Sequence, residues 1–75
     1  MSYMNNSIFS KSVRYIFDNI DQSIELEDIA ASVGVSLSTL KRLFVEATHR
    51  SPGTFIRRMR MERAFRTLKN KNDLY

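Results

Sequence analysis

The sequence predicts an all-α fold, a helical bundle of about four helices. Apolar residues recur every three or four positions in four successive segments, which is the period of an amphipathic helix. No segment alternates apolar and polar residues as a half-buried strand would. The chain has 75 residues, of which 43% are hydrophobic, so we expect a single domain around one small core. The predicted helices cover about residues 8–20, 26–33, 37–48 and 52–69.

The first predicted helix, about residues 8–20, follows from a stripe of apolar side chains. Its members are Phe9, Val13, Ile16, Phe17 and Ile20. Ser7 and Ser10 are the candidate N-caps, because a serine hydroxyl accepts a hydrogen bond from the free amides of a helix N-terminus. Residues 21–24 are polar and predict a turn.

The second and third predicted helices, residues 26–33 and 37–48, are separated by a short turn that contains Gly34. The second helix has Leu26, Ile29, Ala30 and Val33 on one face. Glu25 precedes this helix and is a weaker cap than serine, whereas Ser36 is a good N-cap for the third helix. Glycine suits the left-handed position after a helix. Two short helices joined in this way form a helix-turn-helix pattern.

The third predicted helix has two distinct faces when successive residues are placed about 100° apart. The apolar face comprises Leu37, Leu40, Leu43, Phe44 and Ala47. The opposite face comprises Ser38, Lys41, Arg42 and Val45. After this helix, His49 stands where the chain often needs a positive φ, which histidine tolerates less well than glycine.

The polar face of the third helix suits the major groove of DNA. Arginine and lysine donate hydrogen bonds to guanine, serine can donate or accept, and a valine methyl can meet a thymine methyl. The competing interpretation is a solvated Lys41 and an ion pair between Arg42 and Glu46. Such a helical pair contributes only about 0.2–0.5 kcal/mol. A bidentate contact between arginine and guanine would contribute roughly 1–3 kcal/mol.

The fourth predicted helix, residues 52–69, begins with Ser51 as its cap and Pro52 in its first turn. It has two apolar sectors on roughly opposite sides. The first sector, Phe55, Ile56 and Met59, can close the core. The second sector, Met61, Ala64, Phe65 and Leu68, has no apparent partner and predicts an interaction face. The final stretch KNKNDLY, residues 69–75, predicts a frayed tail.

Charge is distributed unevenly along the chain, whose net charge is +4. Residues 1–40 have an acidic excess, whereas residues 41–71 contain ten lysines and arginines against Glu46 and Glu62. This asymmetry favours a polyanionic partner over a merely basic, soluble surface. The chain has no cysteine and one histidine, so no disulfide or metal centre is expected, nor a cofactor. No nucleophile–base arrangement or phosphate-binding loop indicates an enzyme.

A segment from Ile24 to Leu68 closely resembles the first helix-turn-helix of AraC/XylS-type transcriptional regulators. The shared runs are L-x-x-[IL]-A at Leu26, Ile29 and Ala30; S-x-S-x-L-x-R-x-F at Ser36, Ser38, Leu40, Arg42 and Phe44; Ser51-Pro52 with Phe55; and R-[LM]-x-x-A at Arg60, Met61 and Ala64. The resemblance is specific because many spaced positions agree at once. It implies a homeodomain-like helix-turn-helix in a bacterial regulator that binds double-stranded promoter or operator DNA.

The resemblance also implies which residues contact DNA. The third helix would enter the major groove, with Ser38, Thr39, Lys41 and Arg42 facing the bases, although the helical wheel places Thr39 nearer the edge of that face. Ser36, Arg50 and Arg57 are the candidates for contacts with the DNA backbone. RNA polymerase is a further candidate partner.

The family's DNA-binding domain normally has two such units joined by a long helix, which here would be residues 52–69. We therefore expect residues 1–75 to be one helix-turn-helix domain, either a fragment or a reduced single-unit protein, without a sensor domain. The second apolar sector would then meet the missing unit or a second copy. The competing function is a protein-interaction module that does not bind DNA. Membrane binding is disfavoured because arginines interrupt both faces of the fourth helix, and we expect a cytoplasmic, nucleoid-associated protein.

Overall fold

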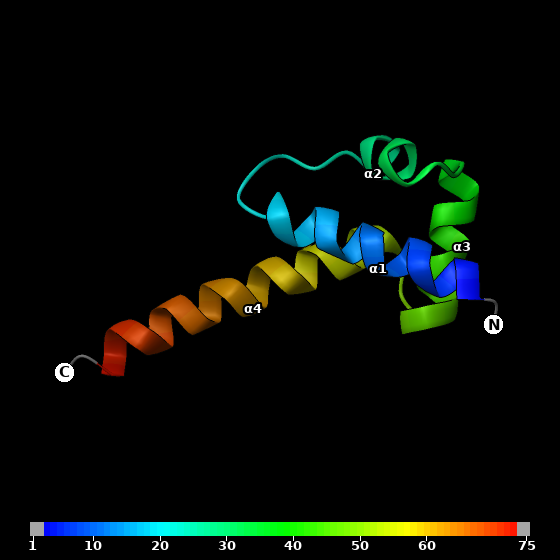
Figure 1. The fold of residues 1–75 in the computed structure, drawn as a ribbon. Coiled ribbons are helices and arrows are strands. Elements are labelled where there is room, and N and C mark those ends of the chain that lie inside the picture. The colour runs from blue at the N-terminus through cyan, green and yellow to red at the C-terminus, as the bar shows by residue number, and fades with distance from the viewer. Residues whose placement is uncertain (1–2, 74–75) are drawn as a thin grey trace.

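The computed structural model describes the backbone of residues 3–73 and the side chains of residues 6–66. It has four helices: α1, Tyr3–Asp18; α2, Leu26–Val33; α3, Leu37–Thr48; and α4, Pro52–Asp73. The described backbone contains no strand, which confirms the all-α prediction. The first three helices gather at one end of the molecule, and α4 starts beside them and extends away as a single arm (Figure 1).

The predicted bounds are correct for α2 and α3 but wrong for α1. This helix begins at Tyr3 and ends at Asp18, so Ser7 and Ser10 lie within it and do not cap its start. The apolar stripe, which begins at Phe9, located only the later part of α1. Ahead of the stripe, the consecutive polar residues Asn5, Asn6 and Ser7 interrupt the apolar period, so the sequence does not mark the start of the helix.

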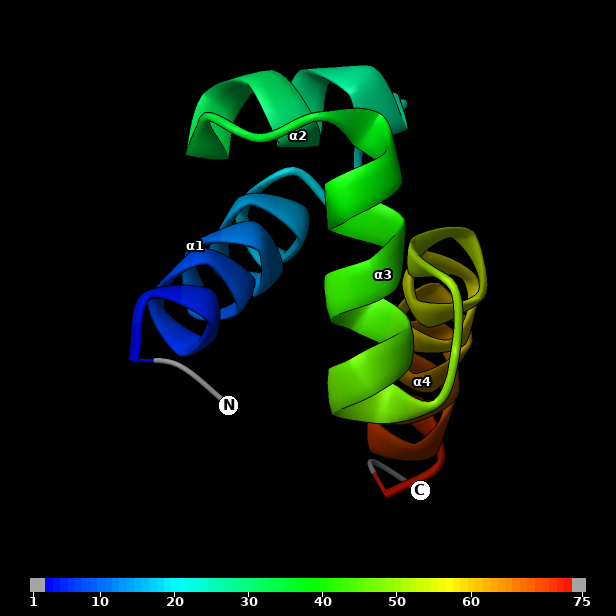
Figure 2. The same cartoon turned by 90° about the vertical axis from the view of Figure 1, so that its right-hand side faces the viewer.

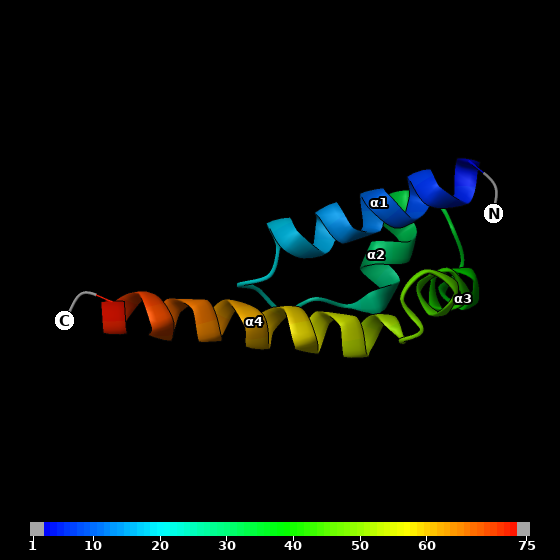
Figure 3. The same cartoon turned by 90° about the horizontal axis from the view of Figure 1, so that it is seen from below.

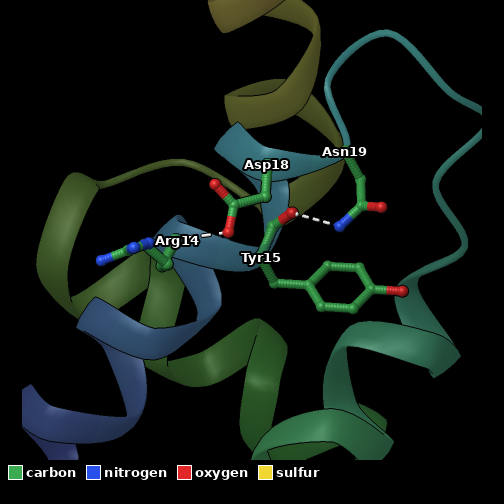
Figure 4. A network of polar contacts seen from close by, with 4 residues as sticks. All are labelled: Arg14, Tyr15, Asp18 and Asn19. Carbon is green, nitrogen blue, oxygen red and sulfur yellow. Dashed lines mark hydrogen bonds and ion pairs between the residues drawn. The ribbon is translucent and has the colours of Figure 1, made fainter.

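Helix α1 ends at Asp18, two residues earlier than predicted, and side-chain hydrogen bonds are present at this end. The Asn19 side-chain amide donates to the Tyr15 carbonyl oxygen at 2.8 Å, and the Asn19 backbone amide donates to the same oxygen at 3.1 Å (Figure 4). Arg14 and Asp18 form an exposed ion pair at 3.5 Å on the same turn. Asparagine side chains compete with the helix for backbone partners, which favours termination at this point.

The core lies where α1, α2, α3 and the first turns of α4 meet. Its buried cluster comprises Ile16, Ile20, Ile29, Ala30, Leu40, Phe44 and Ile56. Phe44 is at the centre of an aromatic group, with ring centroids 5.0 Å from Phe9 and 5.3 Å from Phe55 in edge-to-face geometry. Ser12 is also fully buried, and its hydroxyl donates to the Ile8 carbonyl oxygen at 2.8 Å. That bond satisfies the buried hydroxyl of Ser12. The pattern of apolar residues did not predict that Ser12 would be buried.

Two residues assigned to the apolar faces are exposed in the fold. Phe17 was expected to face the core but leaves 64% of its surface exposed. It lies about one step of 100° from the buried Ile16, at the edge of the stripe. Ala47 is on the apolar side of α3 by angle and is nevertheless exposed. It belongs to the last turn, and the angle around a helix does not tell how far neighbouring helices extend along it.

The first apolar sector of α4 closes the core as predicted. Ile56 is buried, and Phe55 and Met59 pack against the core cluster. The predicted end at residue 69 was too early, because the backbone is helical through Asp73. The expected fraying is therefore wrong for residues 69–73, and residues 74–75 lie outside the described range.

Two arginines of α4 bind the segment that follows α1. Arg60 donates from Nε to the Ile20 carbonyl oxygen at 3.3 Å and from Nη2 to the Gln22 carbonyl oxygen at 2.6 Å. One turn further along, Arg63 forms an ion pair with Asp21 at 3.0 Å. These contacts connect residues about forty positions apart and fasten the end of α1 to α4.

Candidate nucleic-acid interface

The turn between α2 and α3 depends on the backbone freedom of one residue. Gly34 has φ 76°, its amide donates to the Ala31 carbonyl oxygen at 3.3 Å, and the Val35 amide donates to Ala30 at 3.0 Å. Paired bonds of this kind end a helix around a left-handed residue. A Cβ at Gly34 would have nothing within 4 Å, so the requirement for glycine comes from φ and not from crowding.

The N-terminus of α3 is capped by Ser36, as predicted. The Thr39 amide donates to the Ser36 hydroxyl oxygen at 3.1 Å, and this hydroxyl donates in turn to the Thr39 hydroxyl oxygen at 3.0 Å. Both hydroxyls are therefore engaged with each other in the described structure. Glu25, in contrast, precedes α2 in the cap position without a side-chain hydrogen bond, in agreement with its being a weaker cap.

The two faces of α3 separate in the fold as the sequence indicated. Leu40 and Phe44 are fully buried and Leu43 nearly so. Ser38, Lys41, Arg42 and Val45 are exposed, whereas Thr39 is half-buried. In Figure 2, α3 is the helix nearest the viewer, and the other helices lie above, beside or behind it. The exposure of these four side chains shows that the described helices leave this face of α3 uncovered.

Lys41 and Arg42 supply positive charge on this surface. Arg42 forms no ion pair with Glu46 or with any other residue whose side chain the structure describes. The competing interpretation of Arg42 as half of a helical ion pair is therefore not supported. A cation that is held by no internal carboxylate is available for an external anion or base edge.

The other end of α3 positions the next basic residue. His49 has φ 62°, as expected, and its amide donates to the Val45 carbonyl oxygen at 2.8 Å. The Thr48 hydroxyl donates to the Phe44 carbonyl oxygen at 2.7 Å and accepts from the Arg50 amide at 3.2 Å. These bonds define the direction in which the chain leaves α3.

The candidate backbone contacts differ in their surroundings. The Ser36 hydroxyl accepts the hydrogen bond that caps α3, whereas the side chains of Arg50 and Arg57 are exposed. Arg50 lines a shallow pocket of about 180 Å³ together with Arg58, Phe55, Met59 and Glu62. Arg58 was not among the predicted site residues. A helical wheel of α4 could not predict that Arg58 lines the same pocket as Arg50, because Arg50 precedes that helix.

Other kinds of site have no support among the described residues. No group of three or more histidine, aspartate or glutamate side chains within them could hold a metal ion. None of the helices, over the range searched, combines the length and apolar character that a membrane crossing requires.

Comparison with known families agrees with this geometry. Residues 29–74 match the family model of a helix-turn-helix domain. The match starts within α2 and includes the turn, all of α3 and nearly all of α4, which is more than half of the chain. No solved structure matches the chain. The family match indicates a DNA-binding domain of the transcription-regulator type.

Proposed function

We propose that this protein, which belongs to the AraC-type helix-turn-helix family, binds specific double-stranded DNA sequences by placing α3 in the major groove. The proposal rests on one observation. Leu40, Leu43 and Phe44 anchor one side of α3 in the core, while the opposite side presents an exposed polar row. An anchored helix with a free polar face holds its donors in a constant arrangement.

The side chains of α3 suggest separate roles in the groove. Arg42 would donate to guanine O6 and N7, and Lys41 would donate to a neighbouring base edge or phosphate. Ser38 is in the first turns of the helix, the part that this motif inserts most deeply. Val45 would contact a thymine methyl group. Thr39 is half-buried and bonded to Ser36, which supports a contact at the edge of the face.

The basic residues outside α3 suit the phosphate backbone. Arg50 precedes α4 and Arg57 lies on its second turn, and both are exposed. Arg58 lines the same shallow pocket as Arg50 and can join that contact. Contacts with phosphate orient a protein on DNA without selecting a sequence. A single module buries only ~600–1,000 Å² of protein surface, so we expect modest affinity.

The test compares Arg42→Ala with Arg57→Ala. A binding site is first selected from random duplexes, and each variant is then titrated against the selected and a scrambled duplex over a salt series. Arg42→Ala should weaken binding to the selected duplex by about 1–3 kcal/mol and reduce discrimination between the two duplexes. Arg57→Ala should weaken both duplexes equally and reduce the salt slope by about one.

Two outcomes would contradict this assignment. An Arg42→Ala variant that keeps full discrimination removes Arg42 from base recognition. Failure of the wild-type protein to enrich any duplex in the selection supports the second candidate function, a protein-interaction module. That alternative is favoured by Met61 and Phe65, which are 65% and 69% exposed on α4. The Leu68 side chain, the remaining large member of that predicted face, lies outside the described side chains.

A further inference from the structure

An open groove lies where the end of α1 meets α4, and the DNA-binding proposal does not use it. Its volume is about 450 Å³. Its lining residues are Phe17, Ile20, Met59, Glu62, Arg63 and Arg66. In Figures 1 and 3 the end of α1 lies beside α4 at the point where α4 leaves the bundle, whereas α3 lies at the end of the bundle away from the free arm of α4.

The apolar part of the groove continues the surface of the core. Ile20 is nearly buried and Met59 is half-buried against the core cluster, while Phe17 leaves 64% of its surface exposed. Neither wall of the groove covers the Phe17 ring. An exposed aromatic side chain that adjoins half-buried apolar ones is the usual anchor of a contact with another apolar group.

The walls of the groove are held in place by bonds between its two sides. Arg60 donates to the carbonyl oxygens of Ile20 and Gln22, and Arg63 forms the ion pair with Asp21. These contacts hold the end of α1 against α4, so the groove exists before any partner arrives. Binding to a preformed site avoids the cost of ordering it.

Among the charged residues that line the groove, Arg63 is paired with Asp21 and Glu62 is acidic, so Arg66 is the cation there that can meet a carboxylate of an occupant. Arg66 is exposed and lies on the α4 side of the groove, next to the Arg63–Asp21 pair. Between Pro52 and Arg66, α4 contains five arginines and only one acidic residue, Glu62. A second copy that docked through its own α4 would bring two arginine-rich helices together, which is electrostatically unfavourable. An acidic partner has the complementary charge.

We propose that this groove binds an acidic amphipathic helix of a partner protein. The apolar face of that helix packs on Phe17 and Met59, and its flanking carboxylates lie near Arg66. An amphipathic helix seated in an apolar groove is a recurrent form of protein recognition. No residue of α3 lines the groove, so a helix seated there leaves the exposed face of α3 uncovered. The groove adjoins the pocket of Arg50 and Arg58, because Met59 and Glu62 line both.

The probe for the test is a synthetic helical peptide of about 18 residues, long enough to form a helix in water. It has leucines at helical spacing on one face and glutamates beside them, and a second peptide has lysine in place of every glutamate. Binding is measured by fluorescence anisotropy, and the site is located from amide shifts of the ¹⁵N-labelled 75-residue chain. We expect binding of the acidic peptide alone, with the largest shifts at Phe17, Met59 and Arg66.

Matched variants separate the groove from the rest of α4. Phe17→Ser and Arg66→Glu should each weaken the acidic peptide by about fivefold or more, as for the loss of a principal interface contact. Phe65→Ser removes an equally exposed phenylalanine that does not line the groove, and Arg57→Glu reverses an arginine outside it. Both control variants should keep the wild-type affinity within a factor of about two. Circular dichroism verifies that each variant is folded.

Four outcomes would overturn the proposal. The first is the absence of amide shifts with the acidic peptide, and the second is equal affinity for the lysine peptide. The third is a loss of affinity caused by Phe65→Ser instead of Phe17→Ser, which would move the site to the outer sector of α4. The fourth is an equal effect of Arg66→Glu and Arg57→Glu, which would reduce the interaction to non-specific charge attraction. None of these outcomes depends on whether the protein binds DNA.

Discussion

The consecutive helices α3 and α4 contain similar residues but arrange them differently around the helix axis. Both start behind a serine whose hydroxyl accepts a backbone amide, and both are basic. In α3, apolar and polar side chains stay on separate faces along the helix. In α4, the apolar side changes midway, and the sequence positions of the arginines spread them around the helix. Positive charge alone therefore does not identify a DNA-binding face, because the face must also be held in one orientation.

Arg42 and Arg60 illustrate this difference. The Arg42 side chain is exposed on an anchored helix and has no described carboxylate partner. The Arg60 side chain is bonded to two carbonyl oxygens of the same molecule and so contributes to the fold. Of two arginines in basic segments, one is therefore free for an external partner and the other is bonded within the fold. Only their contacts in the structure distinguish them.

The largest expected effect compares one phenylalanine from each helix. Phe44→Ala removes a fully buried ring that contacts two others and should cost about 3–5 kcal/mol in the free energy of unfolding. Phe65→Ala removes a ring that is 69% exposed and should change that free energy by less than about 0.5 kcal/mol. Urea titrations followed by circular dichroism measure both. Equal losses would mean that Phe65 is packed as Phe44 is, and the contrast between the helices would fail.

The next largest effect compares the two glycines. Gly34 lies in the turn before α3, and Gly53 lies in the first turn of α4. Gly34→Ala should destabilise the protein by about 1–2 kcal/mol, because φ 76° is unfavourable for a residue with a Cβ. Gly53→Ala should raise stability by up to about 1 kcal/mol, because Gly53 is helical and has free space around it. Thermal unfolding measures the two signs. A stable Gly34→Ala variant would show that the turn does not require the left-handed residue.

The comparison between Arg60 and Arg57 should give a smaller effect on stability. Arg60→Ala removes two hydrogen bonds to carbonyl oxygens, and we expect a loss of about 1 kcal/mol because the side chain is largely exposed. Arg57→Ala should leave the free energy of unfolding nearly unchanged. The salt slope of DNA binding should respond in the reverse order, decreasing for Arg57→Ala and staying constant for Arg60→Ala. A lower slope for both would place Arg60 on phosphate as well.

The smallest expected effect concerns the residue that connects α3 to α4. His49→Gly should leave stability equal or raise it by up to about 1 kcal/mol, because glycine adopts φ 62° without strain. His49→Val serves as the control and should destabilise, since a β-branched residue is disfavoured at positive φ. Melting temperatures measured under identical conditions provide the comparison. A clear loss for His49→Gly would indicate that the imidazole makes a contact that the protein needs.

Sequence reasoning predicted the helix-turn-helix unit closely and α1 less well. The bounds of α2 and α3, the cap at Ser36 and the positive φ of His49 all agree with the structure. These features depend on residues within a few positions of each other. The start of α1 could not be predicted in the same way, because the consecutive polar residues Asn5, Asn6 and Ser7 interrupt the apolar period there. The proposed base-contacting row on α3 is exposed, and its role in DNA binding stays a prediction.

The sequence alone determined the local conformations: the helical periods, the left-handed turn at Gly34 and the two faces of α3. Each of these follows from side-chain chemistry and backbone sterics within one or two helical turns. Only the tertiary structure decided which side chains are covered. It left Phe17 exposed beside a groove, directed Arg60 to the carbonyl oxygens after α1, and placed Arg58 beside Arg50. Burial and long-range hydrogen bonds depend on how another segment of the chain is placed against a helix. The spacing of residues along that helix does not specify this placement.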